Sequence, residues 1–348
     1  MQRLTHNSTI LNCLRSIFFI GAWLLPVAGA VAQDEQTQGD EEVPHFMTMY
    51  DDPYDIRNLY LHFQPFFGEV GALNVVGGLG IEGNYYHKNL FNVWLAFRTS
   101  YGKRFDINRD AAYRNATNSN KFPLYMNAEL GGTYHFRDEM KESTSKVLLY
   151  SKNLKGTDWA ATLARDAEIP GKVRNVIGIR LGGVFHNSVA NINNVLQAQG
   201  KELFYSDGTP VLNESMYSNM NAFIIFAGAS YSWIRNYAVE FSERWDPSGD
   251  DQILTPFVDL MFAPVINLAD VQLPAETVST ASIAKMAFGF RGGVTGKFNR
   301  KLSWGYAAEM GLRPGLKKSG FYLMFKMSFP LWAKKLKVGA VVAEEEGE

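Results

Sequence analysis

Apolar and polar residues alternate over stretches long enough to cross a lipid bilayer, and this pattern constrains the fold more than any other feature. In the stretch 91–101, Phe91, Leu95 and Phe97 fall on one face, and Asn92 and Arg98 fall on the other. A period of two places successive side chains on opposite faces, so it predicts a β-strand rather than a helix. A tilted strand needs about 9–11 residues to cross a membrane.

The same pattern recurs from residue 58 onward and predicts an all-β, antiparallel, up-and-down transmembrane β-barrel of about 12 strands (10–14). Short turns join the last three strands, as in a meander. Val147–Ser151 is the least certain strand because it is short. The predicted strands are Leu59–Phe67, Val75–Tyr86, Phe91–Tyr101, Leu124–Phe136, Val147–Ser151, Val173–His186, Ala222–Ile234, Tyr237–Trp245, Gln252–Leu268, Met286–Phe298, Leu302–Leu312 and Phe321–Leu331.

An even number of strands puts both ends of the barrel segment on one side of the membrane. With twelve, the turns at His87–Asn89, Arg137–Ser143 and Asn299–Arg300 fall on that side. The long connections Gly102–Lys121 and Lys152–Gly171 fall on the other side. The segment Asn187–Ser218 breaks this rule, because it is long but would lie with the short turns. Either the strand count is wrong there, or this segment is a plug or a partner surface.

The first 32 residues have the pattern of a cleaved signal peptide. Arg3 and Arg15 precede an apolar run, and Ala30-Val31-Ala32 fits a cleavage site before Gln33. Cys13, the only cysteine, lies inside this segment, so the mature chain is expected to have no disulfide or thiol chemistry. The predicted divisions are a signal peptide (1–32), a flexible acidic segment (33–56), the barrel (57–332) and a charged tail (333–348).

Charged residues of both signs occur on the faces predicted to point into the barrel. A charge in a membrane is costly unless it is paired or faces water. We therefore expect either an ion-pair network that fills a narrow lumen or a lining that selects a polar solute, and neither sign dominates. These residues are Glu82, Arg98, Glu129, Arg174, Arg180, Glu240, Asp259, Arg291, Glu309, Arg313 and Lys326.

Several other functions have little support in the sequence. A formal net charge of -1 argues against nucleic-acid binding, which needs a clustered basic surface. His62, His87, His135 and His186 lie in no recognisable nucleophile motif, so no catalytic residue is assigned. No helix signal follows the glycines at 77, 78 and 80, which disfavours a phosphate loop. We predict no metal site and no cofactor, because cysteine–histidine clusters and calcium-ligand spacing are missing from the sequence.

The chain resembles bacterial outer-membrane β-barrel proteins of the Bacteroidota type over about residues 58–332. The signal peptide ending at Gln33 and the alternating stretch Phe321–Phe329 carry the resemblance. Many such barrels end on an aromatic residue, whereas this chain continues past Trp332 to an acidic end. The resemblance implies a location in the outer membrane and contact with its lipid.

Three classes of function are compatible with these expectations. The first is a barrel that acts as a passive pore, a docking scaffold for envelope proteins, or an accessory of an envelope transport or secretion machine. The second is a barrel enzyme that acts on lipids or peptides. The third is a soluble secreted β-sandwich or adhesin, whose apolar faces would pack between two sheets. The burial of the apolar faces distinguishes the third class from the first.

Overall fold

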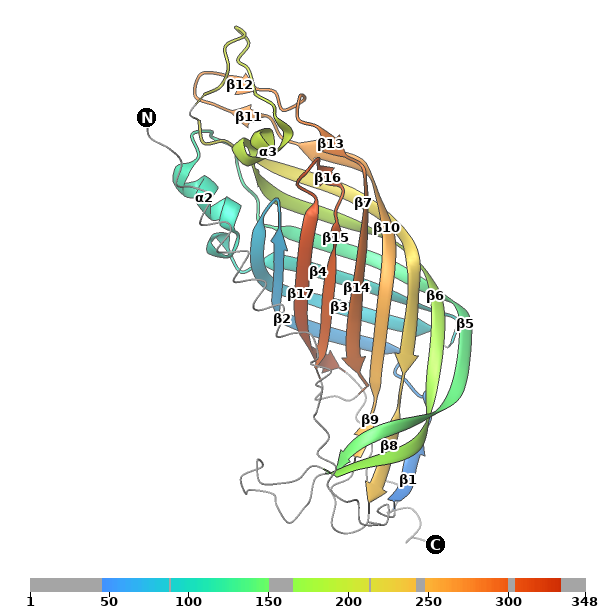
Figure 1. Cartoon of the computed structure of the whole chain (residues 1–348). Coiled ribbons are helices and arrows are strands. Elements are labelled where there is room, and N and C mark those ends of the chain that lie inside the picture. Colours follow the sequence, from blue (N-terminus) through green and yellow to red (C-terminus); the bar gives the residue numbers. More distant parts are fainter. Residues whose placement is uncertain are drawn as a thin grey trace, which may run out of the picture. The chain divides into compact units, whose positions relative to one another are not determined.

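A closed barrel of ten antiparallel strands forms most of the computed structural model, which describes residues 46–87, 89–149, 165–212, 214–241, 248–299 and 304–332 (Figure 1). The predicted signal peptide and charged tail lie outside these residues. Each barrel strand pairs with its neighbours along the chain, and β17 closes the barrel on β2. The strands are β2 (Leu59–Gly71), β3 (Val75–His87), β4 (Phe91–Ser100), β5 (Met126–Leu149), β6 (Arg165–Asn191), β7 (Tyr217–Ile234), β10 (Gln252–Leu268), β14 (Phe288–Phe298), β15 (Gly305–Leu312) and β17 (Phe321–Trp332).

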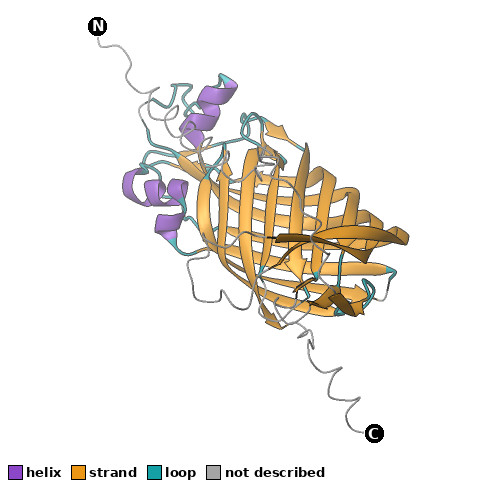
Figure 2. Ribbon diagram, turned by 60° about the horizontal axis from the view of Figure 1, so that its bottom comes forward, coloured by secondary structure: helices purple, strands orange, loops and turns teal. Residues whose placement is uncertain are grey.

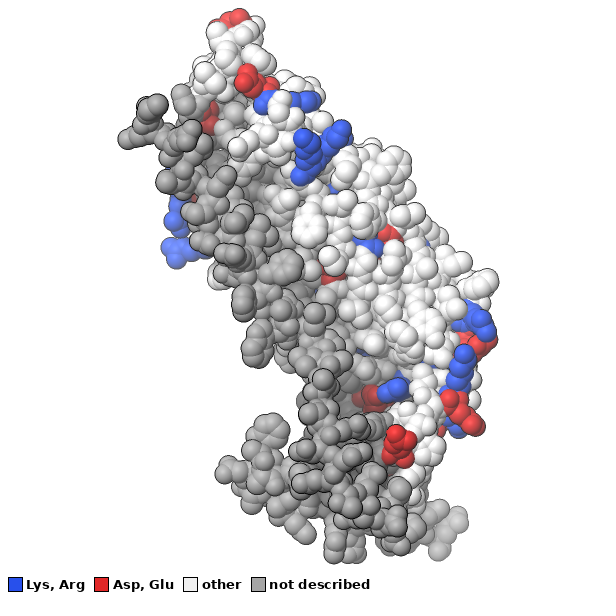
Figure 3. Space-filling view, in the orientation of Figure 1, with Lys and Arg blue, Asp and Glu red and all other residues white. Residues whose placement is uncertain are grey.

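The two faces of the wall are inverted relative to a water-soluble protein. On β4, Arg98 is buried at 3% exposure, whereas Leu95 is 59% exposed. On β10, Asp259 is fully buried and Leu260 is 70% exposed. Apolar side chains therefore cover the outside and polar side chains fill the inside, in one closed barrel rather than two stacked sheets. Figure 3 shows the resulting surface, on which charged residues gather mainly near the ends of the barrel.

The predicted number of twelve strands was wrong by two. Val147–Ser151 is not a separate strand, because Val147–Leu149 continues β5 without a turn and pairs with β6. The supposed turn at Arg137–Ser143 is part of the same strand. Tyr237–Trp245 overlaps β8 (Tyr237–Phe241), which pairs with β1 and β9 outside the barrel.

With ten strands, the connections that contain the described helices lie at one end of the barrel, here called the loop end, together with the connections 269–287 and 313–320. Residues 187–218 lie there, so the exception seen with twelve strands came from miscounting. Lys152–Gly171, whose residues 165–171 are described, instead belongs to the opposite end. The loop-end elements are η1 (Lys103–Phe105), α2 (Ile107–Asn115), α3 (Ile192–Gln199), β11 (Val271–Gln272), β12 (Thr277–Val278), β13 (Lys285–Met286) and β16 (Gly315–Leu316).

The loop end has an apolar core of its own. Side chains of α3, including Val195 and Leu196, pack with Val271, Val278 and Leu316 from the following connections. Asn191 caps α3 by accepting a hydrogen bond from the Asn194 backbone N–H at 3.1 Å. These connections are thus held in one arrangement. In the described part of the chain, neither α-helix has the length and apolarity that a membrane-crossing helix requires.

The opposite end, where β2 begins and β17 ends, is called the terminal end. Here β1 (Phe46–Asp51), β8 and β9 (Ser248–Asp250) form a three-stranded sheet, which Figure 2 shows at the near end of the barrel. Phe46 and Phe241 of this sheet pack with Ile169 from the extended part of β6. Part of the segment 33–56, predicted to be flexible, therefore forms an ordered strand.

Backbone groups between β1 and β2 are tied to the terminal end by two asparagines. Asn236 Nδ2 donates to the carbonyl oxygens of Asp52 and Asp55, at 3.1 and 2.7 Å. Asn299 Nδ2 donates to the Asp55 carbonyl oxygen at 3.1 Å, and Asn299 Oδ1 accepts from the Arg57 N–H at 3.2 Å. The residues before β2 thus bridge the β7–β8 and β14–β15 connections.

The close contact of β3 and β4 gives a test of the barrel wall. A Cβ atom at Gly78 would lie 2.0 Å from the Thr99 carbonyl oxygen, whereas one at Gly83 on the same strand would meet nothing within 4 Å. We expect Gly78→Ala to lower the free energy of unfolding by about 1–3 kcal/mol and Gly83→Ala to change it little. Urea unfolding of the refolded barrel, followed by tryptophan fluorescence, measures both. Equal effects would contradict the described pairing of β3 and β4.

Candidate functional site in the barrel interior

An ion-pair network built around Arg291 of β14 crosses the middle of the barrel. Arg291 Nη2 lies 2.8 Å from Glu129 Oε1 on β5, and Nε lies 2.9 Å from Asp259 Oδ2 on β10. Its Nη1 lies 3.4 Å from Glu309 Oε2 on β15. In the closed barrel β14 and β5 are four strands apart by the shorter way round, β14-β10-β7-β6-β5, and six by the longer way. This contact therefore spans the lumen rather than following the wall.

Arg180 of β6 shares the Asp259 carboxylate. Its Nε lies 2.9 Å from Asp259 Oδ1, while Arg291 takes the other oxygen. The Arg180 guanidinium also lies over the rings of Trp94 and Phe257, at 4.5 and 4.2 Å from their centroids. Such stacking stabilises a cation that has lost most of its water. The network is thus packed as well as paired.

A second group of charges joins β3, β4 and β17. Lys326 Nζ contacts Glu82 Oε2, and Arg98 Nη2 lies 3.9 Å from the same oxygen. Arg98 Nη1 lies 3.7 Å from Glu129 Oε2, which connects this group to Arg291. Gln64 of β2 donates to Glu82 at 2.8 Å and accepts from Arg98 Nε at 3.2 Å.

Arg313, just after β15, forms the layer nearest the loop end. Its guanidinium makes two parallel hydrogen bonds to Glu69 of β2, at 2.7 and 2.8 Å. Tyr125 OH donates to the same carboxylate at 3.0 Å, and His186 Nε2 lies 3.3 Å from Arg313 Nη1. Paired, planar contacts of this kind are among the stronger ion pairs in proteins.

Formal charges in these three groups cancel. Each acid and each cation lies within 4.0 Å of an opposite charge, and five of each sign are present. Buried charges tolerate a low-dielectric interior only when they are paired and hydrogen-bonded. The acids are Glu69, Glu82, Glu129, Asp259 and Glu309, and the cations are Arg98, Arg180, Arg291, Arg313 and Lys326.

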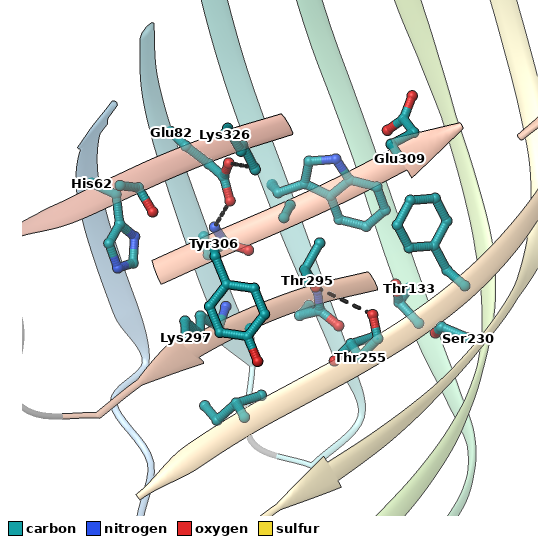
Figure 4. A pocket seen from close by; sticks show the side chains of 18 of the residues that line it. His62, Glu82, Thr133, Ser230, Thr255, Thr295, Lys297, Tyr306, Glu309 and Lys326 are labelled. Carbon is teal, nitrogen blue, oxygen red and sulfur yellow. Dashed lines mark hydrogen bonds and ion pairs between the residues drawn. The ribbon is translucent and has the colours of Figure 1, made fainter. Parts of the chain in front are cut away.

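A polar cavity of about 90 Å³ lies inside the barrel, lined mainly by the parts of the strands nearer the terminal end. Figure 4 shows the side chains around this space, with His62, Lys297 and Tyr306 on one side and Thr133 and Ser230 on the other. Cavities of about 20 and 10 Å³ occur nearer Arg313. A water molecule needs about 10–15 Å³ by this measure, so the cavity of about 90 Å³ holds several waters.

Lys297 is the cation of this cavity that lies outside the network. Its Nζ is 4.8 Å from the ring centroid of Tyr60 and 4.5 Å from that of Tyr86. Hydroxyls line much of the rest, and Ser232 Oγ lies 2.8 Å from Thr255 Oγ1. The arrangement can hold water or a small polar solute.

Nine of the eleven residues predicted to face the lumen belong to these groups: Glu82, Arg98, Glu129, Arg180, Asp259, Arg291, Glu309, Arg313 and Lys326. Arg174 is buried near the terminal end, where it pairs with Asp138 at 2.6 Å and stacks on Tyr54 at 4.4 Å. Glu240 requires a correction. It lies on β8, which is not a barrel strand, so it does not face the lumen.

Glu69 and Lys297 face the lumen, but neither was among the residues predicted from the sequence to do so. By the period of two, Lys297 shares a face of its strand with Arg291, but it was not among the residues predicted to face the lumen. Glu69 was missed because the predicted strand ended at Phe67. In the structure the register of β2 against β3 shifts between Gln64 and Phe67, so even-numbered residues face inward before the bulge and odd-numbered residues after it. Pro65 was the available signal, since proline in a strand marks a bulge or an edge.

The described histidines lie in no catalytic pair of the kind that a serine or threonine nucleophile would need. His135 lies between Asn89 O and Asn92 Oδ1, at 3.0 and 3.1 Å, and none of the described histidines hydrogen-bonds to a serine or threonine. The residues that the structure describes contain no group of three or more potential ligands that could hold a metal ion. No protein-family model matches the sequence, and no curated protein matches it either.

The central arginine provides a test of the network. Replacing Arg291 by Met leaves three buried carboxylates short of a cation, so we expect the free energy of unfolding to fall by about 3–5 kcal/mol. Adding Glu129→Gln to Arg291→Met should recover part of that loss, because one of those charges is then removed. Arg137→Met, which breaks the exposed Arg137–Glu139 pair, serves as the control and should have no measurable effect. Urea unfolding of the wild type and the three variants measures these free energies. An Arg291→Met variant as stable as the wild type would contradict the role given to the network.

Proposed function

We propose that the protein spans the bacterial outer membrane as a barrel that does not conduct solutes and acts as a docking scaffold or accessory of an envelope machine. The inverted wall is the observation that carries the proposal. Apart from the part of β5 and β6 that extends past the wall, the charged side chains described in the barrel strands are buried or half-buried. A closed barrel satisfies every backbone group in lipid, which an open sheet does not.

A non-conducting barrel fits the contents of the lumen better than a passive pore does. Barrels of about eight strands are just wide enough for side chains to fill, and ten strands add little room. Here the ion pairs cross the lumen, and the cavities beside them measure about 90 and 10 Å³, which is room for several waters in one and for no more than one in the other. A solute would have to break several buried ion pairs to pass.

Ordered structure at both ends supports the scaffold role. The loop end has an apolar core of its own, and the terminal end carries the three-stranded sheet and the extension of β5 and β6. A pore needs neither feature. Export through the predicted signal peptide would place the terminal end in the periplasm and the loop end outside the cell, as is usual for barrels with long outer loops. No specific observation favours the enzyme hypothesis.

Membrane insertion is tested by extraction with carbonate and by placing an arginine on the outer face of the wall and measuring the stability of the barrel in lipid vesicles. We expect the protein to stay with membranes washed in carbonate. Leu260→Arg should lower the stability of the barrel in lipid vesicles by about 2–4 kcal/mol, because Leu260 lies at mid-strand on the outer face. Met140→Arg, at an exposed position on the extended part of β5, is the control and should change it by no more than about 1 kcal/mol. Release by carbonate, or equal tolerance of both variants, would overturn the membrane assignment.

Measurement of ion conductance distinguishes the scaffold hypothesis from the pore hypothesis. We expect the purified wild-type protein to give no stable channel steps in a planar lipid bilayer. Glu129→Ser/Arg291→Ser removes one charge of each sign from the centre of the network and should produce such steps. Heat-modifiable gel mobility would confirm that the variant is folded. Steady conductance of the wild-type protein would favour the pore instead.

A further inference from the structure

The connection after β4, Tyr101–Asn115, lies beside the barrel wall at the loop end and is here called the rim segment (Figure 1). Gly77 of β3 faces outward, and a Cβ atom there would lie 4.0 Å from Phe105 Cδ1. Phe105 therefore rests near the outer wall, next to the apolar band. Phe105 is 56% exposed, and Tyr101, Ile107 and Tyr113 are exposed as well. Exposed aromatics at the edge of an apolar band are typical of a membrane interface.

Cations gather on the same segment. Lys103 and Arg104 are exposed, and the Lys103 ammonium lies 5.0 Å from the ring centroid of Tyr113. The guanidinium of Arg109 lies 5.7 Å from the same centroid. The acid of this helix, Asp110, is paired with Arg114 at 2.9 Å. Asp106 is the other acid of the segment, so four cations (Lys103, Arg104, Arg109 and Arg114) stand against two acids and leave an excess of positive charge.

Arg109 gives an independent indication of a ligand. Its side chain is 8% exposed, and its Nε and Nη1 are buried without a hydrogen-bond partner. The nearby Asp106 accepts hydrogen bonds from Asn74 Nδ2 at 2.7 Å and from the Arg109 backbone N–H at 3.0 Å, rather than from the guanidinium. A buried charged donor without an acceptor is costly, and an anionic oxygen would remove that cost.

We propose that the rim segment binds the phosphate headgroup of a lipid in the leaflet that surrounds the barrel. Lys103, Arg104 and Arg109 contact the phosphate, and Tyr101 and Phe105 lie against the start of the acyl chains. Arginine and lysine side chains near an anionic membrane surface contribute about 1 kcal/mol each. The inference rests on the proposed membrane location, because it is the lipid around the barrel that reaches Phe105.

Native mass spectrometry of the detergent-solubilised protein tests this site. The probes are dioctanoyl phosphatidic acid, dioctanoyl phosphatidylcholine and inorganic phosphate. We expect the first to bind at least tenfold more tightly than either of the others. Lys103→Gln/Arg104→Gln should weaken that binding about tenfold or more. Lys317→Gln/Lys318→Gln removes two exposed cations from another loop-end connection and should leave it unchanged.

Arg109→Gln, tested separately, should weaken binding of phosphatidic acid as well. If this variant does not fold, the exposed pair Lys103 and Arg104 still decides. Equal binding of the two lipids, equal binding of inorganic phosphate, or an unaffected Lys103→Gln/Arg104→Gln would overturn the proposal. Because the assay is done in detergent, a negative result with a carbonate-resistant protein rejects the lipid site and leaves the membrane barrel standing.

Discussion

Pairing of charges inside a narrow barrel is the constraint on which the rest of the structure depends. An outer wall covered by Leu, Ile and Phe leaves the lumen as the place for charged residues, and ten strands leave little space for water there. The charges of the network therefore each meet an opposite charge from another strand, whereas Lys297 lies against the rings of Tyr60 and Tyr86. Arg291 meets three opposite charges, the carboxylates from β5, β10 and β15. The fold and the network consequently depend on each other.

Cross-lumen contacts favour one of the two roles considered for the interior, which are bracing of the wall and selection of a solute. A selectivity lining would keep its charges on the wall, facing an open path. Here Arg291 reaches from β14 to Glu129 on β5, and Arg313 reaches from the end of β15 to His186 on β6. These side chains fill the centre of the lumen, so the polar cavity near Lys297 is bounded toward the loop end by the network. Such a filled interior supports the proposed bracing role, in which the two ends are the surfaces for recognition.

Much of the barrel could be predicted from the period of two, because that pattern depends on which face of each strand is apolar and points outward. The alternation identified the ten barrel strands and the inward face of most of them. It gave two strands too many, since a polar stretch such as Arg137–Ser143 looks the same in a turn and in a strand that continues past the wall. Pairing of β8 with β1 rather than with the barrel is a long-range choice that local alternation does not encode.

For the interior, the sequence could predict which residues face inward but not which of them pair with one another. Arg291 and Glu129 are 162 residues apart, and their contact follows from closure of the barrel and from the register of every strand between them. A single bulge is enough to reverse which residues of a strand face inward, and the register shift before Phe67 turns Glu69 into the lumen in this way. The number of strands likewise determines at which end of the barrel each connection lies. Twelve strands separated the connections 102–121 and 187–218, whereas ten bring both to the loop end, next to α3 and its apolar core. Under the proposed membrane location this placement matters for the rim segment. Lysine and arginine beside exposed aromatics are common on a solvated loop, but at the edge of a wall that faces lipid they are typical of contact with lipid headgroups.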